Sequence, residues 1–140
     1  MPDGTRARRR GVLDDSPVNW CTGEVLSAAI AVHDALGPGL LESAYRLCLV
    51  HELRGRGLAV RTEVTMPLRY RGVRLQEAYR LDLLVGELVV VEIKALPAVR
   101  PVHRAQLLSY LKLSGYPVGM LLNFHEQRLM DGYSRLVNKL

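Results

Sequence analysis

Three charged residues stand inside the most apolar, strand-like part of the chain. Glu92 and Lys94 interrupt the run LVVVEIKAL at residues 88–96, and Asp82 interrupts the preceding run YRLDLLV. Alternate residues of a strand share a face, so Glu92 and Lys94 point to the same side of the predicted sheet. Ionised groups are costly to desolvate there unless they pair or bind something. Two interpretations are open: a salt bridge on a partly exposed strand, or a functional site.

A turn at Gly86 and Glu87 would join the two strands as a hairpin. Counting outward from this turn, position 82 pairs with about 91 or 92, and the register decides whether Asp82 and Glu92 share a face. Carboxylates without His or Cys favour a hard cation, Mg²⁺ or Mn²⁺. Such a cation lowers the pKa of a bound water and neutralises phosphoryl charge, and a nearby lysine can orient or deprotonate that water. This chemistry is metal-dependent phosphodiester hydrolysis.

The remaining patterns predict the elements that position these residues. Helices are expected over 22–36, with Thr22 as N-cap, over 40–57 and over 102–115. Strands are expected over 58–70, 73–85, 88–96 and 116–124, with a last short strand within 131–140. Pro67 predicts an edge strand or a bulge. The order α, α, β, β, β, α, β predicts an α/β class, or α+β sandwich, with a mixed central sheet.

Size and composition predict one domain without a membrane span. The chain has 140 residues, which we divide into a disordered basic leader at 1–18 and a single domain at 19–140. No secretory signal follows the basic start, and Cys21 and Cys48 are expected as small buried hydrophobes in a cytoplasmic protein. The net charge is +5, of which the leader's four arginines and three aspartates supply only +1. The basic domain therefore suits a nucleic acid partner.

Five segments occur in an order that resembles a known superfamily. They are LGPGLLESAY, YRLDLLV, VVVEIKAL, HRAQLLSYLKL and GMLLNF. An Asp in one strand followed by Glu-x-Lys in the next resembles the PD-(D/E)xK nuclease superfamily, and GLLESAY at 39–45 resembles its small GxxExxY family. The resemblance covers about residues 22–138 and implies a restriction-endonuclease-like fold with an αβββαβ core. Two positions depart from the pattern: Leu81 stands where the superfamily's name has proline, and Ser134 where a basic residue is expected.

The resemblance also implies roles for individual residues. The implied ligands of Mg²⁺ or Mn²⁺ are Asp82, Glu92, the backbone carbonyl of Ile93 and, directly or through water, Glu42. Lys94 would be the catalytic lysine, and Gln106 would contact the substrate or the attacking water. His103, Gln106 and Tyr110 share one helical face, which is either an exposed stripe or part of the cleft. We place Gln106 in the cleft, leave His103 open, and expect Tyr45 and Tyr110 to be packing residues.

These observations predict a metal-dependent nuclease, a phosphodiester hydrolase acting on DNA or RNA. Sequence-independent, salt-sensitive contacts to the nucleic acid backbone are expected from Arg46, Arg54, Arg56, Arg69, Arg71 and Arg100. One alternative is a catalytically silent nucleic-acid-binding or assembly module that retains the nuclease fold, and another is a purely structural interaction protein. A chain of this length leaves substrate specificity to a homodimer or a partner protein. The choice between DNA and RNA is open.

Overall fold

The strand-like runs of the sequence form one five-stranded sheet in the computed structural model, which describes residues 16–139. Its strands are β1 (Val60–Tyr70), β2 (Val73–Val85), β3 (Val89–Lys94), β4 (Val118–Asn123) and β5 (Tyr133–Val137). They lie in the order β1-β2-β3-β4-β5, with β3 and β4 parallel and the other neighbours antiparallel. The predicted mixed sheet is confirmed.

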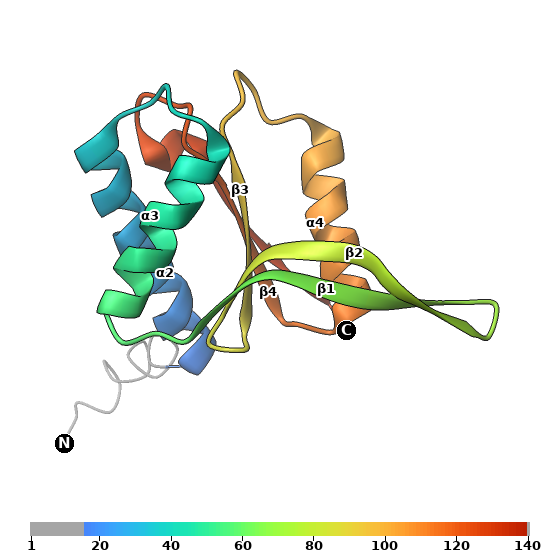
Figure 1. The fold of residues 1–140 in the computed structure, drawn as a ribbon. Helices are drawn as coiled ribbons and strands as arrows, with labels where there is room; N and C mark the ends of the chain where they lie inside the picture. Colours follow the sequence, from blue (N-terminus) through green and yellow to red (C-terminus); the bar gives the residue numbers. More distant parts are fainter. Residues whose placement is uncertain (1–15, 140) are drawn as a thin grey trace, which may run out of the picture.

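Helices cover both faces of this sheet (Figure 1). On one face lie α2 (Pro17–Leu36) and α3 (Glu42–Gly55), and on the other lies α4 (Pro101–Ser114), which connects the parallel strands β3 and β4. A short 3-10 helix, η1 (Leu129–Gly132), precedes β5. The order α3-β1-β2-β3-α4-β4 reproduces the predicted αβββαβ core. None of the described helices combines the length and the apolarity needed to cross a membrane.

Helix α2 begins earlier than the sequence patterns indicated. Ser16 is its N-cap and accepts a hydrogen bond from the Asn19 N–H at 3.1 Å, with Pro17 in the first turn. The prediction of Thr22 as N-cap is wrong, because Thr22 lies inside the helix and its hydroxyl donates to the Asn19 carbonyl at 3.1 Å. Residues 1–15 of the predicted leader lie outside the described residues, and residues 17 and 18 belong to α2.

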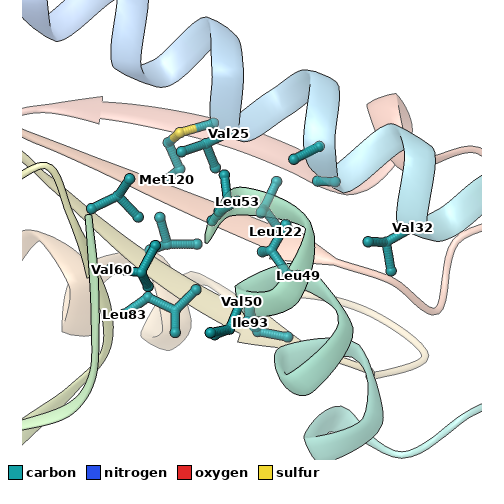
Figure 2. Close-up of a cluster of buried hydrophobic side chains, with 14 of the residues drawn as sticks. Val25, Val32, Leu49, Val50, Leu53, Val60, Leu83, Ile93, Met120 and Leu122 are labelled. Carbon is teal, nitrogen blue, oxygen red and sulfur yellow. The ribbon is translucent and has the colours of Figure 1, made fainter. Parts of the chain in front are cut away.

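The core has two layers, one on each face of the sheet. The larger joins α2 and α3 to the sheet, and Figure 2 shows Val25, Leu53 and Leu122 meeting there from three elements. The smaller joins α4 to the opposite face through Leu81, Leu84, Val90, Leu107, Leu111 and Leu121. Cys21 is buried as predicted. Cys48 is exposed, which corrects the prediction, because the buried side of α3 runs through Tyr45, Leu49 and Leu53 and leaves Cys48 outside.

The β1–β2 hairpin is longer than the rest of the sheet and extends away from it past α4 (Figure 1). Pro67 lies in β1, which is an edge strand, and at a bulge, so both interpretations of this proline are confirmed. Met66 pairs with Tyr79 and Leu68 with Leu75, so three residues of β2 face the single Pro67. Beyond the bulge the hairpin closes at a tight turn of Arg71 and Gly72, both with positive φ.

Candidate active site

Asp82 and Glu92 lie at the point where β2 and β3 separate. The backbone ladder of this pair runs from Val85–Val89 to Leu83–Val91, so the next position places Asp82 opposite Glu92. At this position hydrogen bonds to side chains replace the backbone–backbone hydrogen bonds of the two strands. The Asp82 N–H donates to Oε2 of Glu92 at 3.0 Å, and the Ile93 N–H donates to Oδ2 of Asp82 at 2.9 Å. The sequence-predicted pair is therefore together, with each carboxylate bound to the backbone of the other strand.

The strand β2 rotates at this same position. Residues two apart in a strand normally share a face, yet Leu83 packs in the layer of α2 and α3 whereas Leu81 packs in the layer of α4. Between the pairs Thr62–Leu83 and Val64–Leu81, the residue of β1 that stands opposite Asp82 is Glu63, with φ of +50°. A left-handed residue of the neighbouring strand therefore stands at the position where the alternation of β2 reverses. Asp82 therefore lies where the hairpin leaves the body of the sheet.

Glu92 is almost fully buried, with 4% of its surface exposed. Burial raises its pKa to about 8, and the negative charge of Asp82 acts in the same direction, while the Asp82 N–H and the Lys94 ammonium oppose the rise. The raised pKa favours the protonated form of Glu92 in the metal-free protein. A cation that bound this carboxylate would displace that proton.

Glu42 and Lys94 interact electrostatically with the carboxylate pair. Burial raises the pKa of Glu42, as does the charge of Asp82, whereas Lys94 and Arg46 lower it. Arg46 lies 4.0 Å from the Glu42 carboxylate, one helical turn along α3. Within residues 16–139 no three His, Cys, Asp or Glu side chains lie close enough together to form a ready-made metal cage. Glu42 therefore stands within electrostatic range of the pair, and the structure does not show it as a direct ligand.

The position of Glu42 is set by Tyr45, three residues further along the same motif. The Tyr45 hydroxyl donates to the Gly37 carbonyl at 2.5 Å and accepts from the Leu40 N–H at 3.1 Å. Its ring is fully buried and stacks on Phe124 with 4.6 Å between the ring centroids. Tyr45 thus ties the turn before α3 to the core. Tyr45 packs as predicted, and it also fixes the backbone from which Glu42 projects.

Lys94 has a supporting neighbour, Asn123, that the sequence analysis missed. Lys94 is half-buried at the end of β3, and Asn123 is its register partner at the end of β4. The Asn123 side chain is fully buried, donates to the Leu96 carbonyl at 2.9 Å and accepts from the Leu96 N–H at 3.0 Å. It therefore holds the backbone two residues after Lys94. The signal for it was an amide at the end of the otherwise apolar run VGMLLN.

The three residues predicted on one face of α4 have different surroundings. Nδ1 of His103 accepts from the Arg100 N–H at 2.9 Å, so His103 caps the start of α4. Tyr110 is half-buried, and its pKa is raised by burial and then by the charges of Glu92 and Asp82, so it lies within electrostatic range of the carboxylates. Gln106 is exposed one turn earlier and has no hydrogen bond to any described residue. Its contact with substrate or water stays a prediction.

Two of the arginines expected to contact nucleic acid are engaged in the fold. Arg54 donates to the Val60 carbonyl at 2.9 Å. Arg56 pairs with Glu52 at 3.0 Å and donates to the Ser27 hydroxyl at 2.8 Å. Both link the C-terminal end of α3 to neighbouring segments. Arg69 and Arg71 lie at the end of the β1–β2 hairpin, and Arg100 is exposed before α4.

Comparison with known proteins agrees with this fold. A family model described as the PD-(D/E)XK nuclease superfamily matches residues 19–136. The chain therefore belongs to the PD-(D/E)XK nuclease superfamily. Proteins of this superfamily are generally nucleases that act on nucleic acids and use divalent metals.

A solved structure shows the same architecture. The crystal structure of SSO0001 aligns with a TM-score of 0.51 and 22% sequence identity, over 71% of this chain and 51% of that one. At this identity the similarity supports the fold alone, which is restriction-endonuclease-like, and this chain spans about half the length of that relative. No curated protein matches the sequence.

Proposed function

We propose that this chain is a metal-dependent nuclease that hydrolyses phosphodiester bonds. The observation that carries the proposal is the cross-strand pair of Asp82 and Glu92, joined to opposite backbones at 2.9 and 3.0 Å, with Lys94 two residues further along β3. Membership of the superfamily supports the same chemistry. The spacing Gly39-x-x-Glu42-x-x-Tyr45 supports a finer placement in the GxxExxY family.

The oxygen atoms around this pair fit a hard cation. Oε2 of Glu92 and Oδ2 of Asp82 accept backbone N–H groups, whereas the second oxygen of each makes no hydrogen bond to a described residue. The Ile93 N–H donates to Asp82 on β2. Because the N–H and C=O groups of one strand residue point to the same side, the Ile93 carbonyl also faces the space between β2 and β3. Carboxylate and carbonyl oxygens are the ligands that Mg²⁺ and Mn²⁺ prefer. Asp82, Glu92 and the Ile93 carbonyl would hold the cation, with Glu42 completing the site directly or through water.

The cation would supply a water of lowered pKa and neutralise phosphoryl charge. The chain's own groups would orient the reaction. As an ammonium, Lys94 can orient the attacking water or stabilise charge on the phosphoryl group in the transition state, and as a neutral amine it can deprotonate that water. Gln106 would contact the substrate or that water. Asn123 would keep Lys94 in place through the Leu96 backbone.

The test is cleavage of single- and double-stranded DNA and RNA with Mg²⁺, Mn²⁺ or EDTA. We expect cleavage with either metal and none with EDTA. Asp82→Ala and Lys94→Ala should each lower the rate by about 100-fold or more, because each removes a group that acts on the reacting atoms. Lys112→Ala is the matched control, since Lys112 is exposed at the far end of α4. Cleavage that survives both active-site substitutions would refute the assignment, and binding without cleavage under every metal would favour the catalytically silent module.

A further inference from the structure

The outer part of the β1–β2 hairpin, residues 68–76, makes no contribution to either core layer, and we call it the arm tip. Val64, Met66 and Tyr79 still pack against the layer of α4, and Tyr79 stacks on Tyr110 with 4.9 Å between ring centroids. Every residue from 69 to 78 is exposed. Among them are apolar side chains, with Tyr70 and Val73 each 57% exposed. The arm tip therefore projects from the molecule as a free two-stranded ribbon (Figure 1).

Unbalanced positive charge is concentrated on this ribbon. Residues 64–76 contain three arginines, Arg69, Arg71 and Arg74, and no acidic residue. None of the three forms an ion pair with a described residue: Arg71 lies over the Tyr70 ring at 5.4 Å, and Arg69 donates to the Gly72 carbonyl at 3.4 Å.

The arginines at the base of the hairpin are different. Arg61 is paired with Glu87 at 2.8 Å, and Arg80 lies 3.7 Å from Glu63. Charge is therefore neutralised near the sheet and left free at the arm tip. A surface of this kind suits a polyanion.

The shape of the arm tip selects among polyanions. A two-stranded antiparallel ribbon fits the major groove of B-form DNA, which is about 12 Å wide. The major groove of an A-form RNA duplex is too deep and narrow for protein side chains to read. Because β2 has extra residues at the bulge, the length of the ribbon follows β1: the seven steps from Glu63, opposite Asp82, to Tyr70 span about 23 Å at about 3.3 Å per residue. This length is about two-thirds of one turn of duplex DNA, which is about 34 Å.

We propose that the arm tip binds the major groove of double-stranded DNA about two-thirds of a helical turn from the phosphodiester bond that is cleaved at Asp82 and Glu92, which makes duplex DNA the substrate class. The inference rests on the proposed nuclease function for the position of that bond. Arg69, Arg71 and Arg74 contact phosphates and base edges, and Tyr70 packs against the groove. A second copy of the chain is the less suitable occupant, because two arm tips of the same charge repel each other.

Binding measured in EDTA tests the arm tip independently of cleavage. The probes are a fluorescent 30-bp DNA duplex and an RNA duplex of the same sequence, followed by anisotropy over a range of salt concentrations. The variant is Arg69→Ala/Arg71→Ala/Arg74→Ala. The matched control is Lys112→Ala/Arg128→Ala/Lys139→Ala, which removes the same charge from exposed positions elsewhere. Both variants should melt within about 2 °C of the wild type, because they change only exposed side chains.

We expect the arm-tip variant to weaken DNA binding at least tenfold. The slope of log K against log salt should fall by about 2–3, because each phosphate that an arginine no longer neutralises lowers it by about one. The control should weaken binding less than about threefold. RNA duplex binding should be weaker and should not change with the arm-tip variant. Equal losses for the arm-tip and control variants, or equal losses on DNA and RNA, would overturn the proposal. So would a wild-type dimer, seen by light scattering without DNA, that dissociates in the arm-tip variant.

Cleavage with Mg²⁺ separates this inference from the proposed function. The arm-tip variant should cut long duplexes more slowly than the wild type, and the difference should disappear when less than about half a turn of duplex remains on the arm side of the cut. Arm-dependent binding without cleavage under any metal would refute the nuclease and leave the arm tip supported. Cleavage and binding that are both unchanged in the arm-tip variant would refute the arm tip and leave the nuclease supported.

Discussion

Asp82 and Glu92 each bind the backbone of the other residue's strand: the Asp82 N–H donates to Glu92, and the Ile93 N–H donates to Asp82. The pair is thus held in place by the sheet before any cation arrives. This preorganisation fixes the spacing of the carboxylate oxygens proposed as ligands, and it also places the half-buried Asp82 carboxyl group beside the almost fully buried Glu92. The raised pKa of Glu92 is the consequence.

Glu92→Gln should make the metal-free protein relatively more stable at alkaline pH. The folded-state pKa of Glu92, about 8, lies above the ordinary value of 4.5, so its stabilising contribution is complete below pH 4.5 and is lost as pH rises through 8. Glutamine is neutral throughout and escapes this loss. Urea unfolding in EDTA at pH 5 and pH 9 measures the effect. The free energy of unfolding of Glu92→Gln, measured relative to the wild type, should be higher at pH 9 than at pH 5. The control Glu77→Gln, on the exposed hairpin, should show no such change with pH.

Mn²⁺ or Mg²⁺ should raise the melting temperature of the wild-type protein. A ligand present at 100 times its Kd, and bound only by the folded state, stabilises by about 2.7 kcal/mol. The effect should be larger at pH 8.5 than at pH 6.5, because the cation competes with the proton on Glu92. Thermal melts of the wild type and of Glu92→Ala measure it. Equal stabilisation of both proteins would contradict the assigned ligand, and no stabilisation of either would favour a purely structural protein.

Tyr45→Phe should slow cleavage and destabilise the fold by about 1–2 kcal/mol, because it removes the hydroxyl bonds to Gly37 and Leu40 that fix the start of α3. The matched control is Tyr79→Phe, since the Tyr79 hydroxyl is buried without a hydrogen-bond partner among the described residues. That substitution should be neutral or stabilising. The measurement is kcat and KM on one nucleic acid substrate, together with urea unfolding. A positioning role for Tyr45 requires kcat to fall with little change in KM.

Asn123→Leu should lower kcat through Lys94 rather than through stability alone. The substitution leaves the buried Leu96 N–H and carbonyl without the side-chain partner they have now. We expect a stability loss of about 2–3 kcal/mol and a fall in kcat of about tenfold or more. Asn138→Leu is the control, because Asn138 is also buried and its amide donates to two carbonyls, Leu111 and Tyr116, away from the carboxylates. Equal losses of kcat in both variants would show that Asn123 acts only on stability.

The strands and the proximity of Asp82 to Glu92 could both be predicted from the spacing of residues along the chain. The turn predicted at Gly86 and Glu87 brought position 82 near 91 or 92, and the observed loop of three residues, Gly86, Glu87 and Leu88, sets the register that places Asp82 opposite Glu92. Superfamily membership was recognisable from the same residues together with Lys94 and the Gly-x-x-Glu-x-x-Tyr motif. These features depend on local spacing, which a sequence contains directly.

Other features depend on how the helices and strands pack against one another, and this packing cannot be read directly from the sequence. The apolar side chains of the arm tip alternate as in a strand with one buried face, yet Tyr70 and Val73 are 57% exposed because no helix reaches them. Cys48 had the right spacing for the apolar stripe of α3, but it lies just outside the contact with α2. Asn123 gained its role only when β4 was placed beside β3. Each of these required the tertiary arrangement.

Pro67 also bears on aggregation. A long ribbon with exposed faces and open edges along both strands is a template to which another chain can add a strand, as in amyloid-like assemblies. The proline has no N–H to offer, and the bulge opposite it interrupts the regular ladder midway along the hairpin. The residue that looked like a defect in a strand therefore protects the exposed β1 edge, which allows a projecting basic ribbon to persist in water without recruiting other copies of itself.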